Sequence, residues 1–221
     1  MTYISYICHY NDEQRLQKCL IESLKSNMKK KDELFLLKDY KSQASAYAYA
    51  EKEAKNDLMV FVHQDTYLPK GWRRNLIRQI KILDTVDKDW AIIGCIGLKL
   101  PISPSEISKF VGHFGDEYGE FCSKNLPMQV DTVDSFMFAK RKNGIHFDPK
   151  IPSFHGAIED ICYQAKKDSK GVWIPDIYTE HRTNKQGVDS INLPEIIPAR
   201  DYLIKKWGLP IVCGNILWKS V

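Results

Sequence analysis

Two polar residues, two positions apart, follow directly on an apolar run. The stretch is VFVHQD, residues 60–65, in which His63 and Asp65 follow three apolar residues. An imidazole beside a carboxylate suits a divalent cation, and an oxygen-rich site completed by ligand phosphates suits Mg²⁺ or Mn²⁺. In extended chain, residues i and i+2 point to the same side, so both side chains can face one ligand. The alternative is structural: His63 ends a strand and Asp65 caps the next turn.

A second acidic pair stands in FHGAIEDICYQA, where Glu159 and Asp160 are adjacent. Helical spacing places the apolar residues of this stretch on one face, so we expect Glu159 and Asp160 in the first turn of a helix, on its open side. The pair is a candidate for a site. However, acidic residues in a first turn also interact favourably with the helix dipole, which explains them without any function. His155, just ahead, is either a ligand contact or a loop residue.

Two further clusters join polar residues to predicted strands. His181 ends the strand in IYTEHRT and is followed by basic residues, so it either completes a metal–diphosphate site or marks an exposed strand end. In VDTVDSFMFAKR, Asp134 interrupts an apolar run and Ser135 precedes its continuation. A buried carboxylate in a strand needs a partner, which is either a ligand or a nearby backbone amide.

Strands that alternate with helices must position these residues. The first half of the chain predicts one helix capped by Asn11 or Asp12, a second over Gln43–Lys55 and a third from Trp72. Alternation of this kind indicates β-α-β units and a largely parallel sheet. Ligands bind at the carboxyl ends of the strands in such sheets, and His63 and Asp65 occupy one of these ends. The strands expected in this half are Tyr3–Cys8, Leu34–Leu37, Leu58–Val62 and Trp90–Ile96.

In the second half of the chain, the alternation of predicted strands and helices is interrupted and then resumes. Lys99–Gln129 is rich in Pro, Gly, Ser and charged residues, so we expect a long irregular insertion there. A strand over Val130–Lys140, a helix over Ala157–Lys167 and a strand over Val172–Tyr178 follow. The tail beyond them is basic and contains an amphipathic piece around Tyr202–Trp207.

Bulk properties narrow the class of protein. A chain of 221 residues with 43% hydrophobic and 27% charged residues fits one large domain, or one domain with an appendage. A net charge of +4 permits an anionic ligand but is lower than expected of a nucleic-acid-binding protein. We expect neither a signal peptide nor a membrane span. The six cysteines include no C-x-x-C pair, which favours reduced, mostly buried thiols in a cytosolic protein over a zinc site built from them.

The order of these motifs resembles a known family. FVHQDTYLPKGW, then DSFMF, then EDICYQA and a late strand-end histidine are similar to the family 2 glycosyltransferases of the GT-A fold. The resemblance is greatest to a bacterial streptomycin-biosynthesis-protein-like branch, in which HQD replaces the common DxD motif. It covers roughly residues 3–183 and implies a single α/β domain: a Rossmann-like GT-A fold with a mixed, mostly parallel sheet flanked by helices. Residues 1–98 would form the nucleotide-binding half, 99–183 the acceptor and catalytic half, and 184–221 a C-terminal extension.

The resemblance implies a donor site. Asp65 matches the second acid of the DxD motif, which binds the cation that bridges the donor's diphosphate. His63 matches the first acid, near the ribose and phosphate, and its presence removes a negative charge beside the cation. Asp39, in LLKDYKS, matches the acid that faces the nucleotide base. We also expect Asp134 and Ser135 to contact the donor.

The resemblance also implies a catalytic base. Asp160 matches the residue that deprotonates the acceptor hydroxyl in an inverting displacement, with Glu159 beside it. His181 matches a metal or diphosphate contact. Relatives carry an arginine and an asparagine in the helix before the DxD strand, where this chain has Tyr47 and Ala48.

The function that follows is a metal-dependent, inverting hexosyltransferase-like enzyme of polysaccharide biosynthesis. It would use Mn²⁺ or Mg²⁺ and move a sugar from a UDP- or GDP-type donor to a glycan or lipid-linked acceptor. We expect a cytoplasmic protein with a peripheral contact to the inner face of the membrane. One alternative is a non-catalytic relative that binds a nucleotide sugar or a partner. The other is a metal hydrolase built on His63, Asp65 and His181, which the lack of an H-E-x-x-H motif disfavours.

Overall fold

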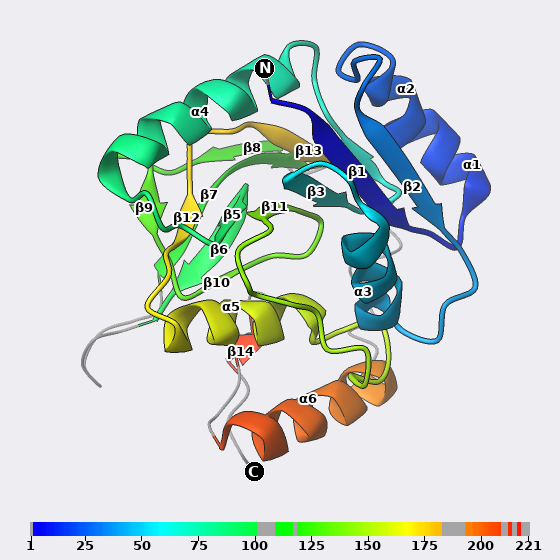
Figure 1. The fold of residues 1–221 in the computed structure, drawn as a ribbon, viewed down its shortest axis with the longest axis vertical. Helices are drawn as coiled ribbons and strands as arrows, with labels where there is room; N and C mark the ends of the chain where they lie inside the picture. The colour runs from blue at the N-terminus through cyan, green and yellow to red at the C-terminus, as the bar shows by residue number, and fades with distance from the viewer. Residues whose placement is uncertain are drawn as a thin grey trace.

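A computed structural model describes residues 2–100, 109–116, 119–182, 193–208, 212–213 and 216–217. It is a mixed α/β domain in which helices cover a central sheet (Figure 1). Within these residues, no helix combines the length and the apolar character needed to cross a bilayer.

The central sheet is parallel at one side and mixed at the other. β1 runs parallel to both β2 and β3, as the β-α-β pattern predicts. β11 lies antiparallel between β3 and β5, and β12 is parallel to β5. The order across the sheet is β2 (Glu33–Leu37), β1 (Ile4–His9), β3 (Leu58–Val62), β11 (Met137–Arg141), β5 (Ile92–Gly94), β12 (Val172–Ile174) and β9 (Met128–Gln129).

A second sheet brings a late strand beside an early one. β13 pairs with β7 on one side and with β4 on the other, and β4 comes directly after β3. The order is β10 (Thr132–Val133), β6 (Ile96–Lys99), β7 (Lys109–Asp116), β13 (Thr179–His181) and β4 (Thr66–Tyr67). β8 (Gly119–Cys122) adds to β7, and β14 (Val212–Cys213) pairs with β15 (Ile216–Leu217).

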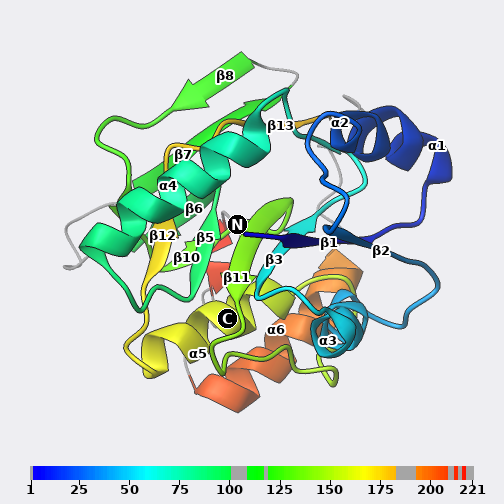
Figure 2. The same ribbon diagram turned by 45° about the horizontal axis from the view of Figure 1, so that its top comes forward.

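Helices lie on both faces of the central sheet (Figure 2). α3 (Gln43–Glu53), α5 (Ala157–Lys167) and α6 (Leu193–Trp207) pack on one face. The other face carries α4 (Trp72–Val86) and a first helix made of α1 (Glu13–Leu16), a π-helical turn η1 (Gln17–Ile21) and α2 (Glu22–Leu24).

Alternation along the strands supplies both layers of core. In β3, Met59 and Phe61 face α3 and α5, whereas Val60 and Val62 face the first helix and α4. Successive side chains of a strand point to opposite faces, so a strand that is apolar throughout must be covered on both sides. All five residues of β3 are buried. A polar residue such as His63 can follow only where the strand leaves the core, so β3 ends there.

Three expected strands differ from the observed elements: two are divided between the two sheets and one is shorter than expected. Trp90–Ile96 contains β5 and the start of β6, which continues to Lys99. Val130–Lys140 separates into β10 and β11, and Val172–Tyr178 ends at β12, with β13 starting only at Thr179. Local breaks explain two of these differences: Asp134 Oδ1 accepts the amide of Phe136 at 3.0 Å, and Pro175 follows β12 without an amide to donate.

The prediction of an irregular insertion over Lys99–Gln129 is wrong for most of the described part. β7 and β8 form an antiparallel hairpin within it, although 101–108 and 117–118 lie outside the described residues. The amphipathic piece expected at Tyr202–Trp207 is the end of a longer helix, α6. The helix over Ala157–Lys167 and the strand over Leu58–Val62 are confirmed with their bounds.

An aromatic cluster beneath α3 dominates one layer of the core. The ring of Phe61 stacks on Phe138 at 4.7 Å between centroids and meets Tyr47 and Phe147 edge-on at 4.8 and 5.0 Å. We expect Phe61→Ala to lower the free energy of unfolding by about 3–5 kcal/mol, because the cluster cannot close over the cavity. Urea unfolding measures this loss. Phe121→Ala, at a side chain that is 40% exposed, should cost far less, and equal losses would contradict the account.

Candidate functional site

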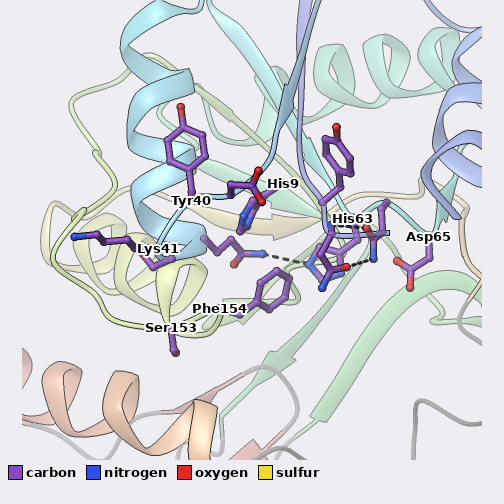
Figure 3. Close-up of a pocket in the computed structure, with 13 residues that line it drawn as sticks. His9, Tyr40, Lys41, His63, Asp65, Ser153 and Phe154 are labelled. Atoms are coloured by element: carbon purple, nitrogen blue, oxygen red, sulfur yellow. Dashed lines mark hydrogen bonds between the residues drawn. The ribbon is translucent and has the colours of Figure 1, made fainter. Parts of the chain in front are cut away.

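A cavity of about 630 Å³ lies at the carboxyl ends of the parallel strands. It is lined by the residues that follow β1, β2 and β3, together with the chain just before α5 (Figure 3). This is the edge at which open α/β sheets bind their ligands. His63, Asp65 and Asp39, all expected in a donor site, line this cavity.

His63 and Asp65 approach each other through a turn, and not through the extended chain that their spacing suggests. The backbone amide of His63 donates to the carbonyl of Phe136 at 2.9 Å. This hydrogen bond joins the end of β3 to the residue just before β11. The amide of Thr66 then returns to the carbonyl of His63 at 3.1 Å, which closes a tight turn around Gln64. The polar residues are therefore held by backbone hydrogen bonds where the sheet ends.

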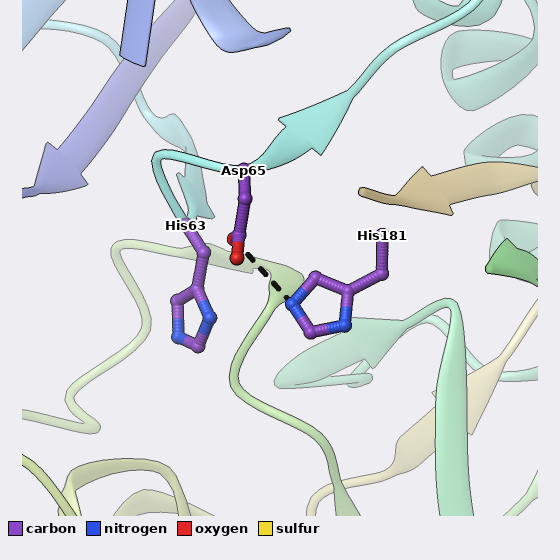
Figure 4. Close-up of side chains that lie close together, drawn as sticks. All are labelled: His63, Asp65 and His181. Carbon is purple, nitrogen blue, oxygen red and sulfur yellow. Dashed lines mark ion pairs between the residues drawn. The ribbon is translucent and has the colours of Figure 1, made fainter. Parts of the chain in front are cut away.

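His181 reaches the same point from the far end of the chain. β13 pairs with β4 so that His181 lies opposite Thr66, the residue next to Asp65. Figure 4 shows the three side chains together, with His181 Nε2 at 3.4 Å from Asp65 Oδ1. The amide of Arg182 also donates to the backbone carbonyl of Asp65 at 2.8 Å. The second sheet thus completes a cluster that the first sheet begins.

The cluster fits a divalent cation. One donor atom from each of His63, Asp65 and His181 lies within 4.8 Å of the others. Asp65 Oδ1 is buried and faces His181 Nε2 at 3.4 Å, so both atoms are placed to bind a shared ligand. Two imidazoles and a carboxylate form a nitrogen and oxygen donor set, which suits Mn²⁺ and leaves positions for phosphate oxygens. Arg15 adds positive charge at 3.7 Å from Asp65 Oδ2.

The protonation states of these groups suit ligation. Burial lowers the pKa of His63 to about 4, with the nearby His181 acting in the same direction. Burial opposes ionisation of Asp65, but the hydrogen bond and charge of His181, together with His63, lower the pKa of Asp65 to about 2. At neutral pH the site therefore presents a neutral imidazole and an ionised carboxylate, which are the forms that bind metals.

Aromatic rings form the other wall of the cavity. His9 stacks on Phe154 with 5.9 Å between centroids, and His63 lies 5.5 Å from the same ring. Asp39 follows β2 with a positive φ of 62°, and Tyr40 beside it meets His9 edge-on at 6.4 Å. These planar groups at the mouth of a cavity can flank a flat ligand such as a base.

Hydrogen bonds hold the floor of the cavity in place. Gln64 Oε1 accepts the amides of Asn11 and Asp12 at 2.9 and 2.8 Å, and Gln64 Nε2 donates to Asn11 Oδ1 at 2.8 Å. Gln43 Nε2 lies 3.4 Å from His63 Nε2. The middle residue of HQD therefore has a structural role: it joins the end of β3 to the start of the first helix.

Sequence reasoning missed His9, Tyr40, Gln43 and Phe154 as cavity residues. His9 ends β1 and Tyr40 follows β2, so the rule that strand ends meet at one edge would have found them. Phe154 and Gln43 carried no such signal, because their places depend on how α5 and α3 pack on the sheet.

Asp134 and Ser135 lie on the turn between β10 and β11. The carboxylate of Asp134 accepts the amide of Phe136, which is the structural role considered for it. Neither residue is among those that line the cavity in the described part of the chain. Tyr47 is fully buried in the aromatic cluster, so the position matched to a donor-binding arginine is a core position in this protein.

The expectation that Glu159 and Asp160 face an open side is wrong. They lie in the first turn of α5, but Glu159 is 3% exposed and Asp160 fully buried. The cause is α6, which packs over the start of α5. Trp207 Nε1 donates to Asp160 Oδ1 at 2.8 Å, and Lys206 Nζ lies 2.9 Å from the same oxygen.

Trp207 offers a test of this cover. Trp207→Phe removes a hydrogen bond to a buried carboxylate, so we expect a loss of about 1–3 kcal/mol in the free energy of unfolding, measured in urea. Trp173→Phe is the matched control, because Trp173 Nε1 donates at 2.8 Å to Asp87, which is only half-buried. Water can replace that bond, so its loss should be smaller. A Trp207 variant as stable as wild type would show that α6 does not hold Asp160.

Solved structures share the fold. A mannosyltransferase, PcManGT from Pyrobaculum calidifontis in complex with GDP-Man and Mn²⁺, matches with a TM-score of 0.55 and 14% identity over 91% of this chain. The chain spans 64% of the length of that mannosyltransferase chain. S. aureus TarS 1–349 matches with a TM-score of 0.52 and 12% identity, covering 95% of this chain and 72% of its own. At these identities the likeness concerns the fold alone.

Sequence comparison identifies the family. A search of curated proteins finds no significant match. The profile of a family described as "Glycosyltransferase like family" matches residues 5–190, which include the cavity, the His63–Asp65–His181 cluster and the start of α5. The chain therefore belongs to the glycosyltransferase-like family.

Proposed function

We propose that this protein transfers a sugar from a nucleotide-diphosphate donor to a glycan or lipid-linked acceptor. The observation that carries the proposal is the His63–Asp65–His181 cluster, which lies at the strand-end cavity of a chain from the glycosyltransferase-like family. The proposal includes a UDP- or GDP-type donor, inversion at the sugar and a cytoplasmic location beside the membrane.

The donor would lie across the ends of β1, β2 and β3. Asp39 would face the base, with the His9 and Phe154 rings beside it. Asp65, His63 and His181 would hold Mn²⁺ or Mg²⁺. The bound cation would neutralise the charge of the departing diphosphate. Contacts of Asp134 and Ser135 with the donor stay a prediction, since neither residue lines the cavity.

Asp160 would act as the base. Its carboxylate takes the proton of the acceptor hydroxyl, the oxygen bonds to the anomeric carbon and the bond to the diphosphate oxygen breaks. Glu159 would support it. Since Lys206 and Trp207 cover Asp160, the acceptor reaches this carboxylate only when α6 moves away from the start of α5. In this proposal residues 1–98 bind the nucleotide, 99–183 serve the acceptor, and α6 of the C-terminal extension controls access to Asp160.

The test is an activity panel. UDP- and GDP-sugars with Mn²⁺ should show hydrolysis, or transfer to one of a range of acceptors, with wild type but not with Asp160→Asn. A second candidate is a non-catalytic relative that binds nucleotide sugars. The observation that supports this candidate is that α6 covers Asp160. Donor binding without turnover in wild type, across the whole panel, would support that candidate and reject the transferase.

A further inference from the structure

We propose a second cation site, for Zn²⁺, formed by His113, Cys122 and Asp176. His113 lies on β7, Cys122 on β8, and Asp176 on the connection between β12 and β13. None of these residues lines the strand-end cavity. The site is independent of the proposed transferase activity.

Strand register places the histidine beside the cysteine. His113 and Cys122 are directly opposite each other in the antiparallel pair of β7 and β8. Opposite residues in such a pair project to the same face with Cβ atoms about 4.5–5.5 Å apart. Glu120, two positions before Cys122 on the same strand, points to that face as well.

Asp176 completes the group from a different part of the chain. His113 Nδ1 lies 2.5 Å from Asp176 Oδ1, and His113 Nε2 lies 3.2 Å from Glu120 Oε1. One donor atom from each of His113, Cys122 and Asp176 lies within 4.8 Å of the others. These distances allow a cation to take up short bonds to all three after small side-chain rotations.

The connection that carries Asp176 is fixed in place. The backbone carbonyl of Asp176 accepts a hydrogen bond from Asn75 Nδ2 at 2.9 Å. Tyr178 packs against Gly115 of β7 so closely that an added Cβ would lie 2.3 Å from the tyrosine hydroxyl. The ring of Tyr178 also lies 5.2 Å from that of His113. The hairpin and the connection therefore meet in a defined arrangement.

The donor set selects the metal. One thiolate, one imidazole and one carboxylate suit Zn²⁺, which takes sulfur, nitrogen and oxygen ligands in a tetrahedral arrangement, whereas Mg²⁺ requires oxygen. Among the described residues, Glu120 and Asp176 form ion pairs with His113 and with no Lys or Arg. The group therefore carries an excess of negative charge that a cation would balance. The lack of C-x-x-C pairs disfavours a multi-cysteine site but does not bear on this mixed one.

Glu120 would position the histidine. When one ring nitrogen of a histidine binds a metal, the other commonly donates to a carboxylate that fixes the ring. Asp176 and Glu120 are at opposite ring nitrogens of His113. A cation beside Asp176 would leave Glu120 in that supporting place. Bound Zn²⁺ would link the β7–β8 hairpin to the chain that leads into β13, which ends at His181.

Cobalt spectroscopy on the full chain tests the proposal. Co²⁺ added to reduced wild-type protein should give thiolate-to-cobalt charge-transfer absorption with tetrahedral d–d bands, and Zn²⁺ should displace it. Both signals should be lost in Cys122→Ser and His113→Asn, with folding of each variant checked by circular dichroism. Asp65→Asn, which removes one of the three ligands of the other candidate site, and Cys19→Ser, at a buried cysteine, should keep them.

Affinity adds a finer test. Glu120→Gln should keep the thiolate band but weaken Co²⁺ binding by about 10–100-fold, as loss of a supporting carboxylate does in other metal sites. An unchanged affinity would remove Glu120 from the site. The proposal as a whole is overturned if wild type shows no thiolate-to-cobalt band, or if the band persists in Cys122→Ser.

Discussion

Asp65→Asn is expected to reduce donor turnover with Mn²⁺ by about 100-fold, equivalent to about 2.7 kcal/mol of transition-state stabilisation. Asp65 is the only carboxylate among the three clustered side chains, and asparagine keeps its shape without its charge. The site would then retain only the two imidazoles as ligands. It would hold the cation that neutralises the negative charge of the departing diphosphate less well. Initial rates at saturating donor, measured across a series of Mn²⁺ concentrations, give the loss.

The control for this variant is Asp89→Asn. Asp89 is exposed on the connection between α4 and β5, so the same chemical change there should leave turnover and thermal stability unaltered. If Asp65→Asn keeps wild-type turnover at limiting Mn²⁺, the cation does not use this carboxylate.

Asp160→Asn is expected to lower kcat by about 10²–10⁴-fold, the usual contribution of a general base. The change leaves the donor cavity untouched, because Asp160 is not among the residues that line it. Donor affinity should therefore stay within error of wild type, which calorimetry with a non-transferable donor measures. A large change in donor affinity would mean that the variant perturbs the fold and not the chemistry.

Asp148→Asn separates the base from the cover. Asp148 accepts hydrogen bonds from Lys206 Nζ at 2.8 Å and from the Tyr202 hydroxyl at 2.9 Å, so it also holds α6. This variant weakens the docking of α6 but retains the carboxylate of Asp160, and most of the kcat should remain. If Asp148→Asn loses as much activity as Asp160→Asn, the loss comes from α6 and the assignment of the base fails.

Much of the fold follows from local patterns. Apolar alternation and helical spacing predict β1, β3 and α5 with bounds close to those observed, and the start of α4. The divided strands could not be predicted in the same way, because Trp90–Ile96 is apolar throughout while its two halves join different sheets. Which sheet a residue joins depends on partners far along the chain, and a local window contains no information about them.

The candidate site shows the same limit. His63 and Asp65 stand at the end of a buried strand, which a sequence pattern reveals. The meeting of His181 with Asp65 depends on the pairing of β13 with β4. The burial of Asp160 depends on α6, which begins after the segment that resembles the family. Contacts between such distant segments are set by the packing of the whole domain.

Titration of Mn²⁺ into the protein, with and without GDP or UDP, tests the central claim most directly. If the His63–Asp65–His181 cluster is the cation end of a nucleotide-sugar site, Mn²⁺ alone binds weakly, one of the two nucleotides strengthens its binding, and Asp65→Asn removes the effect. Tight Mn²⁺ binding that neither nucleotide alters would contradict this account and would favour a metal hydrolase built on the same three residues.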